Sequence, residues 1–165
     1  MDPDHQRDRL ADAIRAGDLK ATKRLVESGA PVNDRRSSDG MTPLSRAAFH
    51  GEMEIVKYLL EQEARISADN RDGNTALHLA AFTCRVEMIE FLVSKGASIG
   101  KRNHRRESSI DVVSGEWSDG LGDFYEGVSR GAGLGLKVDD MKRLRPKIAK
   151  RLRELIDEQR KGRTS

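Results

Sequence analysis

The chain of 165 residues is poor in cysteine, in aromatic side chains and in long apolar runs. Its single cysteine, Cys84, excludes a disulfide within the chain and favours a reducing compartment. No stretch approaches the ~18 consecutive apolar residues that a membrane-spanning helix needs. The acidic start at residues 1–4 is followed by no apolar run, so it does not resemble a secretory signal. We therefore expect a cytoplasmic protein.

Charged residues make up 35% and apolar residues 36% of the chain, and the apolar residues recur at helical spacing. This combination predicts a folded, helix-rich protein rather than a disordered one. The formal net charge of +3 is a mild basic excess, which permits an acidic protein or a nucleic acid as partner and requires neither. Aromatic residues make up only 4% of the chain, so the position of each one is informative.

One segment of the sequence repeats at a fixed offset. Residues 42–49, TPLSRAAF, align with residues 75–82, TALHLAAF, at an offset of 33, and an Asp-Gly pair precedes both. The glycine suits the positive φ of a tight turn. Thr42 and Thr75 suit helix N-caps, and Pro43 suits the first helical position. A period of about 33 with this punctuation predicts a turn followed by two antiparallel helices.

These motifs resemble the signature of the ankyrin-repeat family. The resemblance is carried by DG-x-TPL at residues 39–44 and by NTALH-x-AA at residues 74–81, and it covers residues 38–100 closely. It implies an all-α solenoid whose hairpin tips and first helices form a concave surface. It also implies that this surface binds a partner protein, with no cofactor and no catalysis.

The flanks of the chain follow the repeat less closely. The first unit lacks the Thr-Pro-Leu start, as a capping unit does. In the last unit Ile148 aligns with Ile55 at an offset of 93 rather than 66, so 27 extra residues separate its helices. We predict four repeats, the last one interrupted, and a disordered tail. The repeats span approximately residues 6–36, 37–69, 70–102 and 103–160, the insertion approximately 116–145, and the tail 161–165.

The insertion places its large apolar side chains on one helical face: Trp117, Leu121, Phe124, Tyr125 and Val128. Ser118 or Asp119 can cap that helix, a second short helix is expected from Asp139, and Pro146 is expected to begin the final helix. Two interpretations stay open: the insertion only caps the stack, or it folds over the groove and forms part of a binding site. The ending of the chain resembles that of some small stand-alone bacterial ankyrin proteins, which implies a bacterial origin.

The family's usual contact positions are carried over one by one. They predict a partner-binding surface made of Met41, Phe49, His50, Arg71, Asn74, Phe82, Thr83, His104 and Arg105, with Trp117 of the insertion beside it; the wider set adds Ser38, Asp39, Asp72 and Glu107. Phe49 and Phe82 lie one period apart, so their rings are expected to stack as a ladder. The ladder is either exposed as a binding hot spot or covered by the insertion.

A basic hairpin, KRNHRR at residues 101–106, lies two tips away from Arg35 and Arg36. It is either a solvated tip or a means of steering an acidic partner; nucleic acid is disfavoured because no aromatic residues interleave with these charges. His78 is expected to bond locally and Cys84 to be a buried thiol. The sequence shows no nucleophile–base or metal-ligand spacing, so we expect a monomeric protein-binding module without metal, cofactor or enzymatic activity. The alternative is a small enzyme or ligand-binding protein that uses the insertion near Trp117.

Overall fold

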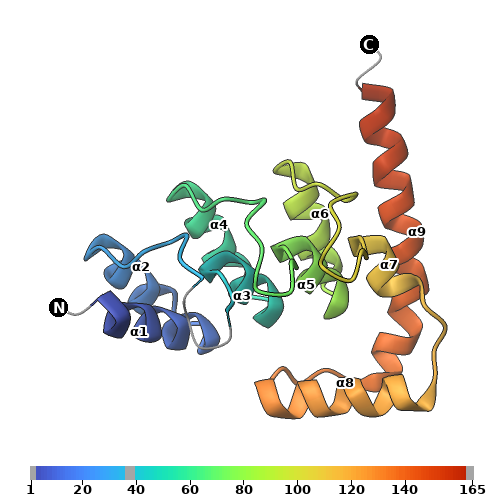
Figure 1. Ribbon diagram of the computed structural model, residues 1–165, viewed down its shortest axis with the longest axis horizontal. Helices are drawn as coiled ribbons and strands as arrows, with labels where there is room; N and C mark the ends of the chain where they lie inside the picture. The colour runs from blue at the N-terminus through green and yellow to red at the C-terminus, as the bar shows by residue number, and fades with distance from the viewer. Residues whose placement is uncertain (1–2, 36–39, 163–165) are drawn as a thin grey trace.

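The computed structural model describes residues 3–35 and 40–162, which form a row of helix pairs (Figure 1). The helices are α1 (Pro3–Arg15), α2 (Leu19–Glu27), α3 (Pro43–His50), α4 (Met53–Glu61), α5 (Ala76–Phe82), α6 (Val86–Ser94), α7 (Ser109–Ser114), α8 (Asp119–Ala132) and α9 (Val138–Gly162). The first helices α1, α3, α5 and α7 pack side by side, and α9 packs on α7 as its second helix. The all-α solenoid of helix pairs is confirmed. The limits of each repeat stay a prediction.

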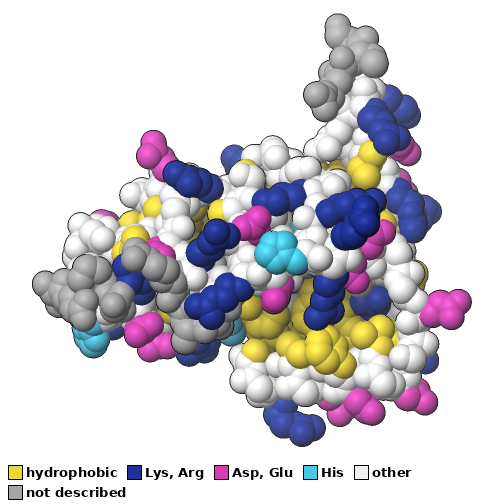
Figure 2. Space-filling view, in the orientation of Figure 1, with side chains coloured by type: hydrophobic (Ala, Val, Ile, Leu, Met, Phe, Trp, Pro, Cys, Tyr) yellow, Lys and Arg dark blue, Asp and Glu magenta, His cyan; other side chains and the backbone are white. Residues whose placement is uncertain are grey.

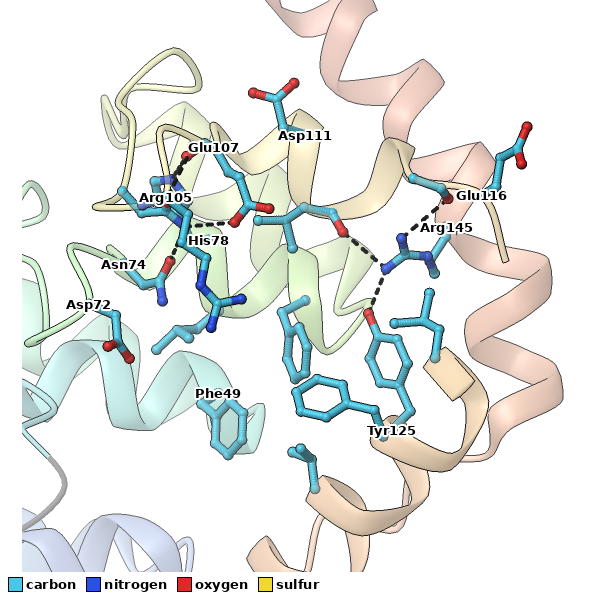
Figure 3. A pocket seen from close by; sticks show the side chains of 18 residues that line it. Phe49, Asp72, Asn74, His78, Arg105, Glu107, Asp111, Glu116, Tyr125 and Arg145 are labelled. Carbon is cyan, nitrogen blue, oxygen red and sulfur yellow. Dashed lines mark hydrogen bonds between the residues drawn. The ribbon is translucent and has the colours of Figure 1, made fainter. Parts of the chain in front are cut away.

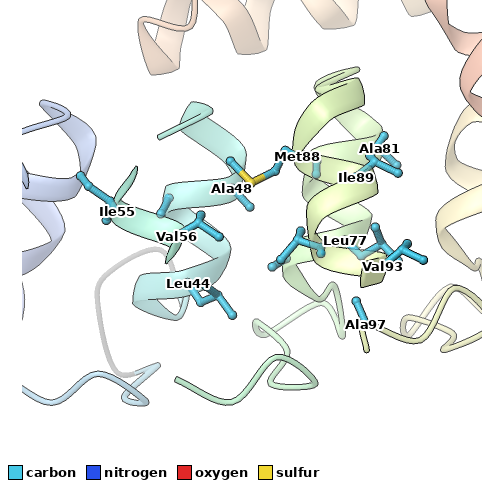
Figure 4. Packing of buried hydrophobic residues seen from close by; sticks show 14 of the residues in the cluster. Leu44, Ala48, Ile55, Val56, Leu77, Ala81, Met88, Ile89, Val93 and Ala97 are labelled. Carbon is cyan, nitrogen blue, oxygen red and sulfur yellow. The ribbon is translucent and has the colours of Figure 1, made fainter. Parts of the chain in front are cut away.

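The core runs along the row, between first and second helices. Ala47, Ala48, Ala80 and Ala81 are fully buried, and their small side chains let neighbouring helices approach closely. The second helices fill the remaining space with larger groups, such as Ile55 and Val56 of α4 and Met88 and Ile89 of α6 (Figure 4). Burying each of these larger side chains stabilises the fold by about 1.5–3 kcal/mol. Because part of that burial is against the adjacent helix pair, each pair depends on its neighbours for stability.

The ends of α3 follow the expected capping chemistry. Thr42 Oγ1 accepts a hydrogen bond from the Ser45 backbone N–H at 3.1 Å, with Pro43 at the first helical position. Gly51 ends the helix at a φ of 85°. One repeat later the same place is held by Cys84, at a φ of 56°. A left-handed conformation costs a residue with a side chain about 1–2 kcal/mol. Burial of the Cys84 side chain in the core offsets this cost. The same burial raises the pKa of the thiol to about 11.

The chain after the insertion differs from the expectation. A short helix from Asp139 and a separate final helix from Pro146 were expected, but α9 is one continuous helix of 25 residues with Pro146 inside it. An interior proline lacks the N–H for the i−4 carbonyl and costs about 3 kcal/mol. A buried stripe on both sides of Pro146, with Met141 before it and Ile148 and Leu152 after it, holds the helix against α7. Packing therefore overrides the local preference.

The disordered tail expected at residues 161–165 overlaps α9, which continues through Gly162. Residues 163–165 lie outside the described part of the chain. Within that part, α8 turns back below the row of first helices and lies next to α5 (Figure 1). The insertion therefore folds onto the concave side of the row.

The interior position of Pro146 gives the first test. We expect Pro146→Ala to raise the free energy of unfolding by about 2 kcal/mol, because the ~3 kcal/mol helix penalty is relieved while the unfolded chain gains some entropy. Pro146 is exposed, so little packing is lost. Urea denaturation followed by circular dichroism measures the change. Pro43→Ala, at a first helical position, is the control and should not stabilise. An unchanged or lower stability for Pro146→Ala would show that the proline is required.

Candidate functional site

A cavity of about 480 Å3 lies between the hairpin tips, α5, α7 and α8. Its floor is apolar, with Phe49, Leu79, Phe82, Val112, Leu121 and Phe124. Its rim carries Asp72, Asn74, Arg105, Glu107, Asp111 and Glu116 (Figure 3). The space-filling view shows the apolar side chains gathered in a hollow, with charged side chains along the tips above it (Figure 2). The volume and the apolar floor with a polar rim are typical of ligand and partner sites.

A continuous stack of aromatic rings forms the floor and its support. Phe49 stacks on Phe82 with 6.4 Å between ring centroids, as the spacing of one repeat predicted. Phe82 then stacks on Tyr125 at 4.8 Å, and Tyr125 stacks on Trp117 at 5.9 Å. Each such pair contributes about 0.5–1.5 kcal/mol beyond burial. The ladder therefore continues from the repeats into the insertion.

The ladder is covered rather than exposed. Phe49 is only 8% exposed, Phe82 is half-buried and Tyr125 is completely buried. Phe124 is different: it meets Phe82 and Tyr125 edge to face, at 6.0 and 6.3 Å, and keeps 54% of its surface exposed. The insertion thus covers part of the ladder and supplies one wall of the cavity through α8. That this wall forms part of a binding site stays a prediction.

Arg145 fastens this wall to the rest of the chain. Its Nη1 donates to the carbonyl of Val112 at 3.0 Å and to the hydroxyl of Tyr125 at 2.7 Å, and its Nη2 donates to the carbonyl of Gly115 at 3.4 Å. The two carbonyls belong to the C-terminal end of α7. The C-cap residue Gly115 has a φ of −64°, so this helix does not end in a left-handed cap. A cation suits a helix C-terminus. Burial raises the pKa of Tyr125, and the nearby Arg145 charge partly opposes that rise.

His78 joins α5 to the next hairpin tip. Its Nδ1 accepts a hydrogen bond from the Thr75 backbone N–H at 3.2 Å, so its Nε2–H donates to the carbonyl of Glu107 at 3.1 Å. Burial lowers the pKa of His78, since it disfavours the charged ring. The expected local hydrogen bond is confirmed. Both ring nitrogens are engaged, so the imidazole serves as a neutral structural link.

Two asparagines, one period apart, shape the tips that form the rim. Asn70 Oδ1 accepts the backbone N–H groups of Asp72 and Asn74, at 3.0 and 2.9 Å. Asn103 Oδ1 likewise accepts the backbone N–H groups of Arg105 and Glu107, at 3.0 and 2.9 Å. Asn103 Nδ2 also donates to Asn74 Oδ1 at 2.9 Å and to Glu107 Oε2 at 3.2 Å. These bonds hold two rim residues of each tip in place, Asp72 and Asn74 in one and Arg105 and Glu107 in the other.

The basic hairpin uses part of its charge internally. Lys101 donates to Asp69 Oδ2 at 2.9 Å and to the carbonyl of Ser67 at 2.6 Å. The Lys101 hydrogen bond is the main reason that the pKa of Asp69 lies below its usual value. Arg35 also contacts Asp69, at 2.8 Å, and Arg102 lies 3.7 Å from Asp111. Arg36 lies outside the described residues. Arg105 remains as the cation of this hairpin that lines the cavity.

Four of the proposed binding residues come together at the cavity: Phe49, Asn74, Phe82 and Arg105. The wider set adds Asp72 and Glu107 to the same rim. Sequence reasoning missed Leu79, Val112, Asp111, Glu116 and Arg145. A signal for Arg145 was present, since it interrupts an apolar stripe between Met141 and Ile148.

The other proposed residues lie elsewhere or are engaged. Met41 borders a small cavity next to α1, and Thr83 is buried with its hydroxyl donating to the carbonyl of Leu79 at 2.8 Å. Four more are occupied or placed outside the cavity: His50 packs edge-on against Phe49, Arg71 covers Gly40, His104 lies beside Gly73, and Trp117 borders a separate cavity between α7 and α9. Ser38 and Asp39 lie outside the described residues. The expected residues therefore do not all line one cavity, and the partner-binding surface stays a prediction.

Residues 3–35 and 40–162 contain neither a helix able to cross a membrane nor a metal-binding cluster. No described helix combines the length and the apolar character that crossing a membrane requires. The same residues contain no cluster of three or more histidine, cysteine or acidic side chains arranged to hold a metal ion. The expected absence of metal and cofactor stays a prediction.

Comparison with known proteins agrees with the repeat. A family model described as Ankyrin repeats (3 copies) matches residues 10–103, more than half of the chain. The chain is 45% identical over 51 residues to Ankyrin repeat and SAM domain-containing protein 6 of Rattus norvegicus, covering 31% of this chain and 6% of that protein. It is 34% identical over 64 residues to Ankyrin repeat domain-containing protein 40 of Mus musculus, covering 39% of this chain and 18% of the relative.

The human Ankyrin repeat domain-containing protein 40 is matched in the same way, at 34% identity over 64 residues and 17% of its length. The chain thus spans less than a fifth of the length of each of these curated relatives. These relatives are vertebrate proteins, and the bacterial origin implied by the ending of the chain stays a prediction.

The buried neutral His78 predicts a pH-dependent stability. Its pKa is lowered in the folded protein, so the unfolded chain takes up the proton first as the pH falls. Stability should therefore be complete above the ordinary histidine pKa of about 6.5 and should fall below it. Urea midpoints between about pH 7.5 and about pH 5 measure this. The drop should shrink in His78→Gln and persist in the control His104→Gln; an equal drop in both variants would contradict the assignment.

The Arg145 contact predicts that the Tyr125 hydroxyl contributes far more to stability than the Tyr58 hydroxyl. We expect Tyr125→Phe to lower the free energy of unfolding by about 1–3 kcal/mol, because a buried guanidinium loses an acceptor. Tyr58 is the matched control, since its buried hydroxyl has no hydrogen-bond partner within the described residues. Tyr58→Phe should be neutral or stabilising. Chemical denaturation of both variants decides, and equal losses would argue against the role given to Arg145.

Proposed function

The chain belongs to the ankyrin repeat family, and we propose that it is a protein-binding module that holds its partner at the cavity between the hairpin tips and α8. Ankyrin repeats are in general protein–protein interaction modules. The observation that carries the proposal is the exposed Phe124 at the mouth of an apolar cavity on the concave side. Exposed aromatic groups beside a desolvated floor are typical anchors of protein interfaces.

Rigidity supports this function. The rim residues are held by the Asn70 and Asn103 hydrogen bonds, and the floor is held by the ring stack from Phe49 to Trp117. A site that is ordered before binding loses less conformational entropy when the partner arrives. The partner would meet a preformed surface and would not need to order it.

A small-molecule site is the second candidate, because about 480 Å3 lies within the usual range for ligand pockets. Catalysis on such a ligand would need an acid or base that is free to exchange a proton. His78 and Asp111 line the cavity with lowered pKa values, His78 mainly through burial and Asp111 through its hydrogen bond to the Ser108 backbone. Both are the third residue of a helix capping box, where His78 bonds through both ring nitrogens and Asp111 through one carboxylate oxygen. The perturbed groups therefore have structural causes, which favours binding over catalysis.

Site-specific photo-crosslinking tests the proposal. Phe124 and Val86 are the two large hydrophobic side chains that the described residues expose, at 54% and 37%. Val86 lies on α6, away from the cavity, and is the matched control. A benzophenone amino acid at each position, in cells that express the chain, should give a discrete protein adduct from position 124 and none from position 86. Adducts from both positions or from neither would contradict binding at the cavity.

A further inference from the structure

We infer that the cavity takes a basic peptide segment, in which one bulky apolar side chain lies next to lysine or arginine. The inference rests on the proposed function, because it names the chemistry of the partner at the same site. It departs from the acidic partner that the basic hairpin suggested. A basic side chain of the partner could lie on the floor of the cavity or at its rim.

The floor suits an apolar side chain and not a cation. A cation binds the face of an aromatic ring, where the quadrupole is negative, and not its positive edge. Phe82 stacks on both Phe49 and Tyr125, with 6.4 and 4.8 Å between ring centroids, so these rings already engage it. Together with Leu79 and Leu121, the floor is an apolar surface that suits an uncharged group.

The rim suits a cation because carboxylates dominate it. Asp72 and Glu116 take part in no ion pair among the described residues. Asp111 caps Ser108 with one oxygen and lies 3.7 Å from Arg102, and Glu107 has one oxygen bonded to Asn103. Against these four carboxylates, Arg105 is the only exposed cation among the described residues that line the cavity.

The two carboxylates without an ion pair among the described residues lie at opposite edges of the cavity, and the Glu116 side chain is turned outward (Figure 3). Figure 3 shows Asp72 and Glu116 on opposite sides of the cavity, with Phe49 and Tyr125 between and below them. A peptide that crosses the cavity can place an apolar side chain on the floor and a basic side chain toward each edge. Arg71 and Arg106 do not line the cavity.

Selection from a random dodecapeptide library on the full chain tests the inference without assuming a partner. We expect the enriched peptides to combine a large apolar residue with neighbouring lysine or arginine, and to be poor in aspartate and glutamate. Fluorescence anisotropy then gives the affinity of the best peptide and of a copy with its basic residues changed to glutamate. The copy should bind more weakly, and the original should weaken as salt rises.

Removing negative or positive charge from the rim should change the affinity for the peptide in opposite directions. The double variant Asp72→Asn with Glu116→Gln should weaken the selected peptide about threefold to tenfold, and Arg105→Ala should tighten it about twofold. Glu61→Gln, an exposed carboxylate on α4 away from the cavity, is the matched control and should change nothing. Phe124→Ser should weaken every peptide that uses the cavity, whatever its charge.

The outcomes separate the inference from the proposed function. Acidic peptides that weaken with Arg105→Ala and with Phe124→Ser would overturn the basic partner and leave the cavity as the binding site. Peptides insensitive to Phe124→Ser would overturn both, since they bind elsewhere. A library that yields no enriched sequence would also overturn both.

Discussion

Arg145 is a buried cation at the point where three helices meet. It has no carboxylate within 4 Å among the described residues, and its charge is balanced by the carbonyl oxygens of Val112 and Gly115, by the Tyr125 hydroxyl and by the dipole of α7. Burying a charge is expensive unless its donors are satisfied. Here the guanidinium N–H groups bond to the free carbonyls at the end of α7 and also to Tyr125, whose ring stacks on Phe82. The wall of the cavity therefore depends on Arg145.

The repeat could be predicted from the sequence because its signals are local. The 33-residue offset gave the helix pairs, and the spacing of Phe49 and Phe82 gave the ring stack, since equal positions in successive repeats lie side by side. The face of α8 could be predicted from helical periodicity, and Ser118 is indeed its N-cap. Each of these patterns needs only a few neighbouring residues to be recognised.

The remaining features depend on contacts between residues far apart in the chain. Arg145 binds a carbonyl 33 residues away, and no local pattern reports such a pair. The hairpin at 101–106 appears basic along the chain, but Lys101 is paired across tips with Asp69, 32 residues earlier. The continuity of α9 through Pro146 likewise depends on packing against α7 and not on helix propensity. The expected break before Pro146 was therefore wrong, because tertiary contacts and not the local sequence decide the continuity of α9.

A stack of repeats loses order from its ends, because a terminal unit has only one neighbour. In this chain one end, through α8 and α9, carries a wall of the cavity, whereas the well-formed motifs lie in the middle. The recognisable segment thus acts as a scaffold, and the least typical segment decides what can be bound. Two proteins that share the central repeats of this chain and differ only after residue 115 would present different surfaces, so likeness in the repeats carries little information about a shared partner.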